Sequence, residues 1–323
     1  MYTVRQYTAQ DYEAWNSFVA ASKNGTFLFN RGFMEYHADR FTDCSLMVFE
    51  GQKLVALLPA NRIGNSVYSH QGLTYGGLII NNKARQETVI ILLKSILHYL
   101  ERQGVEIFFV KTIPVIYHKI PSQEIEYALF LAKAILVRRD SLSVIENASR
   151  PKIANNRMEG VKKGLSNNFT VVESQDYKGF WQDVLLPNLA RKHNAKPVHT
   201  YEEMERIHKN FPENIKLFVV QHEGKILAGT VIFETDTVAH AQYISGNEDK
   251  GITGSLDFLY YELVNRLYSH KKYFDFGTSN EQQGRQLNRG LAFWKESYGA
   301  RTIIQDFYEV PTANHALLDA VFV

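Results

Sequence analysis

Cysteine is almost missing from this chain of 323 residues, in which Cys44 is the only one. A single thiol cannot close a disulfide within the chain, and a zinc site built from several cysteines is excluded as well. The eleven histidines are scattered, and the close pair His193 and His199 has no third ligand at a useful spacing. We therefore predict that the chain holds no metal.

Long hydrophobic runs and an excess of one charge sign are also missing. The longest aliphatic run, Val89–Leu93, is far too short to cross a bilayer. Residues 1–15 lack the apolar core of a secretory signal, so we expect a cytoplasmic protein without membrane insertion. Lys and Arg number 36 against 34 Asp and Glu, a net charge of +2, which argues against a dedicated nucleic-acid binder.

The short motifs of several enzyme classes are absent too. The chain contains no HExxH, GxSxG, GxGxxG or GxxxxGK pattern. This disfavours a zinc protease, a serine hydrolase of the α/β type, a dinucleotide-binding domain and a P-loop enzyme.

What is present is a repeated order of segments: a strand hairpin, further strand, an amphipathic helix and a short apolar strand. The first copy occupies residues 45–58, 66–80, 89–100 and 105–110. The second copy occupies residues 216–233, 238–244, 255–269 and 273–276. This order predicts an α/β (α+β) chain of two similar domains, 1–145 and 146–323, each with a mixed, mostly antiparallel sheet flanked by helices.

The segment that opens the second half, residues 150–164, is markedly basic. Pro151 and Gly164 bracket a stretch that can form a helix. It is either a solvated linker helix or a basic surface that contacts an anionic substrate or cofactor. Taken alone, the segment favours the linker helix. Further on, Thr200 and Glu203 form a capping box that predicts the start of another helix.

Several segments carry a family resemblance. They are the basic stretch Arg150–Lys163, the strand end Asp275–Gly277 within Phe274–Asn280, the closing Gly290–Arg301 with Lys295 and Tyr298–Gly299, and the early aromatic stretches Phe27–Asn30 and Phe33–Tyr36. Together they resemble the FemAB-like branch of the GNAT (N-acetyltransferase-type) superfamily. The resemblance implies two GNAT-like domains, with the donor-binding and catalytic functions in the second.

The chain departs from that family in two places, and the second bears on the donor. Thr278 stands where a basic residue often follows the aspartate-phenylalanine-glycine triplet. No long helical-hairpin insertion interrupts the second half, unlike some peptidoglycan-bridge-forming members that use aminoacyl-tRNA. We therefore expect an acyl-CoA donor, such as acetyl-CoA.

The resemblance places the donor at the turn Asn247–Ser255, where glycines precede a helix and free N–H groups favour a pyrophosphate. An ordinary strand-to-helix turn would look the same. The predicted donor-binding residues are Ser245, Lys250, Gly251, Thr253, Gly254 and Ser255.

In the chemistry that the resemblance implies, an amine attacks a thioester, which requires positioning, a base and an acid for the leaving thiolate. Tyr243, Asp275 and Lys295 are the predicted catalytic residues, with Tyr243 as the late acid. Glu234 and His240 are further candidates for the base, although a histidine in an apolar strand is more often part of the core. The predicted acceptor-binding residues are Arg191, His193 and Asn280.

Three hypotheses follow. The first is an acyl-CoA-dependent N-acyltransferase acting on an amine of a small or cell-envelope or polysaccharide-precursor acceptor. The second is an aminoacyl-tRNA-dependent transferase that adds an amino acid to a peptidoglycan precursor. The third is a binding protein that keeps the fold without the chemistry.

Overall fold

The computed structural model describes residues 2–193 and 196–323, without the side chains of Lys192 and His193. The chain divides into two compact units. Unit 1 comprises Met1–Asp140, Gln282–Gln286 and Ile304–Val323, and unit 2 comprises Ser141–Glu281 and Leu287–Ile303. Whether residues 1–145 and 146–323 fold as separate domains stays a prediction.

Unit 1 contains a four-stranded sheet and part of a ten-stranded sheet, with helices, and two of its strands, β8 and β16, also contribute residues to unit 2. Its strands are β1 (Tyr2–Gln6), β2 (Leu46–Glu50), β3 (Lys53–Leu58), β4 (Asn61–Ile63), β5 (Ser66–Tyr68), β6 (Ile79–Ile80), β7 (Ile107–Lys111), β8 (Ile135–Glu146) and β16 (Arg301–Pro311). Its α-helices are α1 (Tyr12–Ala21), α2 (Arg31–Met34), α3 (Gln86–Arg102) and α4 (Glu124–Leu131), and its 3-10 helices are η1 (Ala9–Asp11), η2 (Phe27–Phe29), η3 (Glu35–His37), η4 (Val115–Tyr117) and η7 (Thr312–Asp319).

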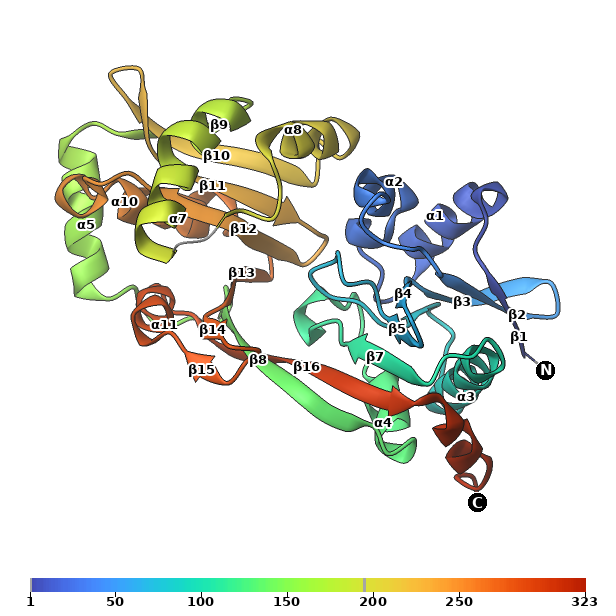
Figure 1. The fold of residues 1–323 in the computed structure, drawn as a ribbon. Helices are drawn as coiled ribbons and strands as arrows, with labels where there is room; N and C mark the ends of the chain where they lie inside the picture. Colours follow the sequence, from blue (N-terminus) through green and yellow to red (C-terminus); the bar gives the residue numbers. More distant parts are fainter. Residues whose placement is uncertain (1, 194–195) are drawn as a thin grey trace. The chain divides into compact units, whose positions relative to one another are not determined.

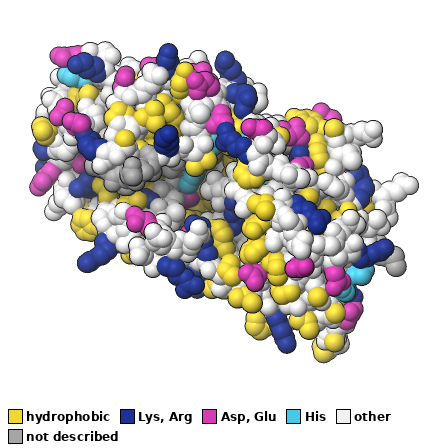
Figure 2. Space-filling view, in the orientation of Figure 1, with side chains coloured by type: hydrophobic (Ala, Val, Ile, Leu, Met, Phe, Trp, Pro, Cys, Tyr) yellow, Lys and Arg dark blue, Asp and Glu magenta, His cyan; other side chains and the backbone are white. Residues whose placement is uncertain are grey.

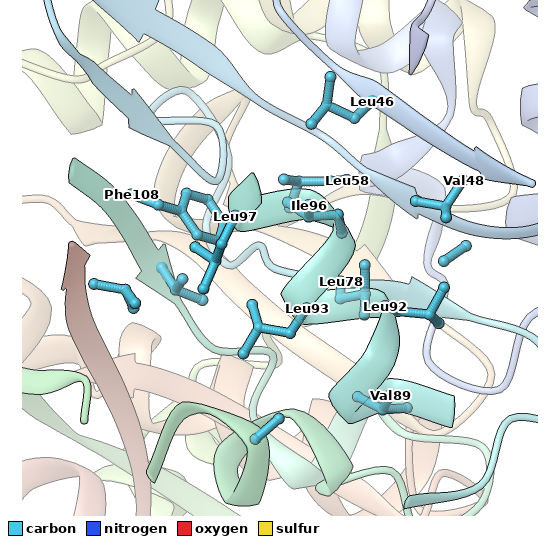
Figure 3. Packing of buried hydrophobic residues seen from close by; sticks show 14 of the residues in the cluster. Leu46, Val48, Leu58, Leu78, Val89, Leu92, Leu93, Ile96, Leu97 and Phe108 are labelled. Atoms are coloured by element: carbon cyan, nitrogen blue, oxygen red, sulfur yellow. The ribbon is translucent and has the colours of Figure 1, made fainter. Parts of the chain in front are cut away.

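The core of unit 1 forms around α3, the helix predicted from the apolar spacing of residues 89–100. One sheet has the order β1-β2-β3-β6 and is antiparallel throughout, while β5 and β7 pair in parallel in the other. Figure 3 shows the apolar face of α3 packed against the inner faces of β2, β3 and β7. A long amphipathic helix needs such a partner, because its packed face supplies most of its stability.

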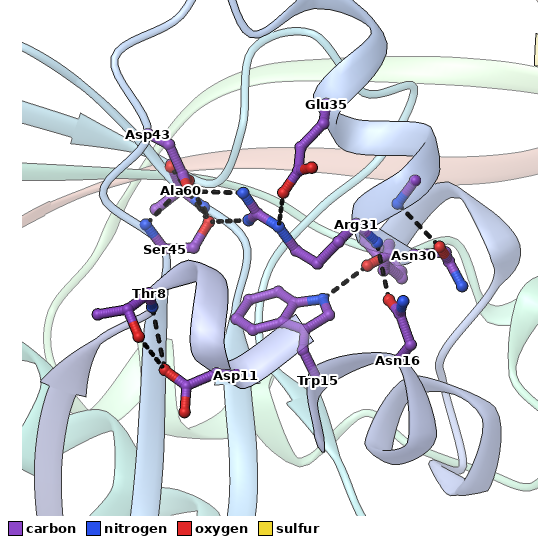
Figure 4. Close-up of polar contacts among 12 residues, drawn as sticks. Thr8, Asp11, Trp15, Asn16, Asn30, Arg31, Glu35, Asp43, Ser45 and Ala60 are labelled. Carbon is purple, nitrogen blue, oxygen red and sulfur yellow. Dashed lines mark hydrogen bonds and ion pairs between the residues drawn. The ribbon is translucent and has the colours of Figure 1, made fainter. Parts of the chain in front are cut away.

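A buried arginine anchors the start of unit 1. Arg31 is almost fully buried, and its guanidinium donates to Glu35 Oε1 at 3.0 Å and to Asp43 Oδ2 at 2.8 Å (Figure 4). It also lies over the ring of Tyr7, 3.9 Å from the ring centroid. Since a buried cation requires partners, these contacts hold α2 to the loop before β2.

Unit 2 contains six strands of the ten-stranded sheet, with helices on both faces, and most of a two-stranded sheet, β14-β15. Its remaining strands are β9 (Thr170–Ser174), β10 (Ile215–His222), β11 (Lys225–Glu234), β12 (Val238–Gly246), β13 (Tyr273–Thr278), β14 (Asn280–Glu281) and β15 (Gln286–Leu287). Its helices are α5 (Asn155–Ser166), α6 (Tyr177–Gly179), the π-helix η5 (Phe180–Leu185), α7 (Leu186–His193), α8 (Tyr201–Asn210), α9 (Lys250–Thr253), α10 (Ser255–Glu262), the π-helix η6 (Leu263–Leu267) and α11 (Arg289–Glu296).

The sheet of unit 2 has the order β8-β13-β12-β11-β10-β9, in which β12 and β13 pair in parallel and the other neighbours are antiparallel. α10 covers one face of the sheet, whereas η5 packs on the strands β11 and β12 (Figure 1). Both units therefore have mixed, mostly antiparallel sheets flanked by helices, which confirms the predicted fold class. The predicted capping box is also present, since Thr200 and Glu203 bond to each other's backbone at the start of α8.

The basic segment forms α5, which packs on α10 through its small residues. A Cβ at Gly160 would lie 2.1 Å from Asp257 Oδ2, and one at Gly164 would lie 2.5 Å from the Cβ of Phe258. The lysines at 162 and 163 are exposed. The segment is therefore a packed helix with a basic outer face, rather than a solvated linker.

The surface carries mixed charge. The face drawn in Figure 2 shows basic, acidic and hydrophobic side chains interspersed, in keeping with the near-neutral composition. Over the described residues, 2–193 and 196–323, no helix combines the length and the apolar character that crossing a membrane requires.

Candidate functional site

The register of the sheet in unit 2 places three chemistry-bearing residues on one face. Phe233 on β11 pairs with His240 on β12, and Val231 pairs with Tyr243. Their neighbours Ala239 and Ala241 belong to the hydrophobic cluster that includes α10. Because side chains alternate along a strand, His240 lies on the opposite face. One extra residue between Ala241 and Tyr243 offsets this alternation, so Tyr243 lies on that face as well, where its ring contacts Trp181 of η5. Asp275 pairs with His240 and lies on that face as well.

His240 and Asp275 meet where two parallel strands part. β12 and β13 pair over three residues, and the last pair is His240 with Asp275. His240 Nδ1 lies 2.9 Å from Asp275 Oδ2, and the backbone N–H of Gly277 donates to Asp275 Oδ1 at 2.7 Å. Asp275 is 1% exposed and His240 is 9% exposed. The carboxylate thus fixes the imidazole through Nδ1 and leaves Nε2 for proton transfer.

Lys295 reaches the same strand end from α11. Its ammonium donates to the carbonyl oxygens of Gly277 at 3.0 Å and Thr278 at 2.6 Å. Gly277 has a φ of +69°, a left-handed conformation that turns the backbone here at little cost for glycine. Burial lowers the pKa of Lys295 to about 8, and the nearby charge of Asp275 opposes that shift. Gly277 therefore links Asp275 and Lys295, because its N–H donates to the carboxylate and its C=O accepts from the ammonium.

Tyr243 contacts a different group. The backbone N–H of His199 donates to the phenol oxygen at 3.1 Å, and His199 Nδ1 lies 2.6 Å from it. The ring of Trp181 meets the Tyr243 ring edge to face at 5.0 Å. Burial raises the pKa of Tyr243 to about 12, so the phenol stays protonated near neutral pH. Across the described part of the chain, no hydrogen bond joins Tyr243 to Asp275 or Lys295.

A β-bulge lies between these two groups on β12. The pairing of β11 with β12 shifts between Val231 and Ile232, where Tyr243 and Ala241 are the partners and Gln242 is the extra residue. A bulge bends its strand and re-aims side chains, and it is common beside functional sites. The bulge follows the point where β12 and β13 part, so β12 leaves its neighbour and changes direction within a few residues.

The predicted donor-binding residues are mostly bonded within the protein. Ser245 donates to the carbonyl of Val184 at 3.1 Å. Lys250 donates to Asn188 Oδ1 and to Gly246 O, both at 3.0 Å. These contacts hold the loop before α10 to β12, η5 and α7.

Gly254 and its neighbours form the start of α10. Gly254 has a φ of +72°, and a Cβ there would lie 2.0 Å from the carbonyl oxygen of Gly160. Thr253 donates to the carbonyl of Asp249 at 3.0 Å, and Ser255 is fully buried. Gly251 has open space around its Cα. The turn therefore presents the start of an α-helix, but Gly254 also serves the close contact with α5.

The predicted acceptor-binding residues are not brought together by any contact within the described residues. Arg191 forms an ion pair with Glu248. The Asn280 side chain accepts hydrogen bonds from the backbone and hydroxyl of Ser141 at 2.7 and 2.8 Å, so it holds β8 in place. His193 ends α7, and its side chain lies outside the part that the structure describes.

The contact between His240 and Asp275 was not predicted from the sequence, in which His240 is a candidate base or a core histidine. The missing information is the parallel register of β12 and β13, which no local pattern in the sequence encodes. The one available signal is that His240 and Asp275 are each a polar residue between apolar neighbours on a strand.

Unit 1 has a cavity of its own. Its volume is about 460 Å³, and its lining includes Tyr68, Phe109, Lys111, Arg138 and Phe307. The rings of Tyr68 and Phe109 stack at 4.7 Å, and the Arg138 guanidinium lies over Phe307 at 4.5 Å. Burial lowers the pKa of Lys111 to about 7, so Arg138 is the permanent cation of this cavity.

Comparison with known proteins supports the fold. No family model and no curated protein matches the sequence. The solved structures that match over nearly the whole length include FemX (TM-score 0.70, 11% identity, 98% of this chain and 99% of that one). They also include L-PGS from Bacillus licheniformis (0.60, 10%, 97% and 95%) and a tandem GNAT protein from the clavulanic acid biosynthesis pathway (0.53, 8%, 97% and 99%). At such identities the likeness shows the fold alone. The chain has the tandem GNAT-like fold of FemAB type, which confirms the resemblance seen in the sequence.

Proposed function

We propose that the chain is an acyltransferase that moves an acyl group from acyl-CoA to an amine, with the reaction in unit 2. The observation that carries the proposal is the meeting of His240, Asp275 and Lys295 where β12 and β13 part. A general base held by a buried carboxylate, at the open end of a strand pair, is an arrangement that a core does not need.

In the proposed reaction the amine nitrogen attacks the thioester carbonyl. A C–N bond forms, the C–S bond breaks, and one proton must leave the amine. His240 Nε2 accepts this proton, and Asp275 orients the imidazole and stabilises its charged form. Tyr243 remains a phenol near neutral pH and donates a hydrogen bond to the leaving sulfur. Lys295 holds the Gly277 turn and thereby positions Asp275.

The donor is proposed to bind at the start of α10. The first N–H groups of a helix and its dipole favour a pyrophosphate, and Gly251 has open space beside it. Lys250 would have to exchange its contacts with Asn188 and Gly246 for a phosphate oxygen. The acceptor is an amine of a small molecule or a cell-envelope precursor, such as an amino sugar precursor. Because acyl-CoA is an intracellular metabolite, the proposed location is the cytoplasm.

The first experiment measures the melting temperature of the pure protein with and without acetyl-CoA at two salt concentrations. A ligand that binds only the folded state raises the melting temperature with dose. Release of CoA thiol is then followed with a panel of amines. If neither acetyl-CoA nor longer acyl-CoAs raise the melting temperature, the acyl-CoA proposal is wrong.

The catalytic assignment is tested separately with Asp275→Asn. Loss of the carboxylate should lower kcat by about 100-fold or more, with little change in donor affinity, because the general base loses its orientation. Asp183→Asn, at an exposed position on η5, is the matched control. Unchanged kcat in Asp275→Asn would remove His240 and Asp275 from the mechanism.

The basic outer face of α5 favours a second candidate, an aminoacyl-tRNA donor. Lys162 and Lys163 are exposed there, and Lys163 also reaches the carbonyl of Gly251 at 3.3 Å. tRNA binding with a steep dependence on salt would support this candidate. Firm binding of either donor without turnover on any acceptor would instead support a non-catalytic protein.

A further inference from the structure

Three metal-ligating side chains converge in unit 1, which contains no residue of the proposed reaction. His98 and Glu101 come from α3, and His315 comes from η7. His315 Nε2 lies 3.3 Å from His98 Nδ1 and 2.9 Å from Glu101 Oε2. All three ligand atoms lie within 4.8 Å of one another.

The fold sets this arrangement through contacts that do not involve the three side chains. His98 and Glu101 are three residues apart on α3 and so share one face of the helix. The η7 segment is held by Thr312, whose hydroxyl donates to Val105 O at 2.6 Å, and by Asn314, whose amide donates to Ala132 O at 2.8 Å. Leu318 is 1% exposed and belongs to the core cluster around α3. Contacts on both sides of His315 in the sequence therefore hold it beside α3.

The distances between the atoms fit a tetrahedral metal ion. Zinc–nitrogen bonds of roughly 2.0–2.1 Å place two ligand atoms of a tetrahedron about 3.4 Å apart. The two imidazole nitrogens are 3.3 Å apart, and Glu101 is exposed and free to move outward by a fraction of an ångström. Each of the three atoms can offer a lone pair to a metal ion, and a single N–H proton can bond to only part of this set. A cation there would bond all three.

We propose that His98, Glu101 and His315 bind one Zn²⁺ ion, with water at a fourth position. Two imidazoles and one carboxylate are typical zinc ligands, whereas Mg²⁺ and Ca²⁺ prefer an all-oxygen set. Solvent exposure of His98 and Glu101 leaves the fourth position open to water. The ion fastens η7 to α3 and so stabilises unit 1, which contains no residue of the proposed acyl transfer.

The sequence gives no hint of this site. His98 and His315 are 217 residues apart, and His98 and Glu101 alone do not form a metal motif. The prediction that the chain holds no metal considered only histidines close in sequence, and this proposal departs from it.

The test uses the full chain, stripped of metal with EDTA and transferred to metal-free buffer. Zn²⁺ is titrated in competition with a chromophoric chelator, and Co²⁺ serves as a probe whose visible absorption reports the coordination geometry. We expect one Zn²⁺ per chain, a higher melting temperature with Zn²⁺, and no competition from Mg²⁺. His98→Gln and His315→Gln should each weaken the zinc affinity by at least about tenfold.

His222→Gln is the matched control, because His222 is exposed and lies next to an acid, Glu223, in unit 2. It should bind zinc as the unchanged chain does. Melting temperatures of the stripped variants establish that each is folded, and Glu101→Gln gives a third variant that retains both imidazoles. Equal zinc affinity in His98→Gln and the unchanged chain, absence of saturation at one equivalent, or displacement of zinc by Mg²⁺ would each overturn the proposal.

Discussion

Replacing Lys295 by methionine should change how the stability of the protein depends on pH. Lys295 is 2% exposed, and burial lowers its pKa from 10.5 to about 8. Between these two values the unfolded chain binds more protons at this position than the folded chain. The ionised lysine therefore destabilises the fold by about 3 kcal/mol near pH 7, at 1.36 kcal/mol for each pKa unit. This cost disappears as the pH rises from 8 to 10.5.

The measurement is urea unfolding of the unchanged chain and of Lys295→Met at pH 7.5 and pH 9.5. The unchanged chain should gain about 2 kcal/mol relative to the variant over this range. Taking the difference between the two proteins cancels the titration of their other groups. The variant also loses the two hydrogen bonds to Gly277 and Thr278. The free energy of this loss changes little with pH, so it does not affect how the stability difference depends on pH.

Lys162→Met serves as the control, because Lys162 is exposed on α5. Its stability difference from the unchanged chain should be flat across the same pH range. If the difference for Lys295→Met is flat as well, Lys295 titrates like a lysine in water. The reasoning from its burial would then be refuted.

Burial lowers the pKa of His70 to about 3, so the fold favours the neutral imidazole and loses stability as the pH falls below 6.5. Between pH 7 and pH 5 the free energy of unfolding, measured in urea, should fall by about 2 kcal/mol more in the unchanged chain than in His70→Asn. Asparagine does not titrate, and it tolerates the φ of +61° at this position. Equal losses in the two proteins would contradict this. Gly254→Ala should destabilise the protein by about 2–4 kcal/mol through its positive φ and its contact with α5, whereas Gly251→Ala, which meets open space, should stay near zero. Arg31→Met should lower the free energy of unfolding by about 2 kcal/mol or more, because Glu35 and Asp43 lose their buried partner. A loss under about 0.5 kcal/mol by calorimetry would show that solvent replaces the guanidinium.

The periodicity of the sequence was enough to predict most elements. The apolar spacing of residues 89–100 gave α3, and the alternating segments 45–58 and 216–233 gave the two hairpins. The capping box at Thr200 marked the start of α8 correctly. These features are local, since each depends on residues within a few positions of one another, and local preferences can be read from a chain directly.

The order of these segments, with the family resemblance, also predicted the tandem fold. It pointed to Asp275 and Lys295, which lie together at the Gly277 turn. It did not show that Ser245 and Asn280 hold neighbouring elements in place, because a polar side chain looks the same in a sequence whether it faces a ligand or the protein.

Only the tertiary structure decided which distant residues meet. His240 contacts Asp275 because β12 and β13 pair in parallel across the intervening helix α10, and that register depends on packing of the whole sheet. His315 lies beside His98 because η7 packs along α3 after more than two hundred residues. Side chains far apart in sequence are brought together by burial of apolar faces, and the chemistry of a site follows from that burial rather than from any local pattern.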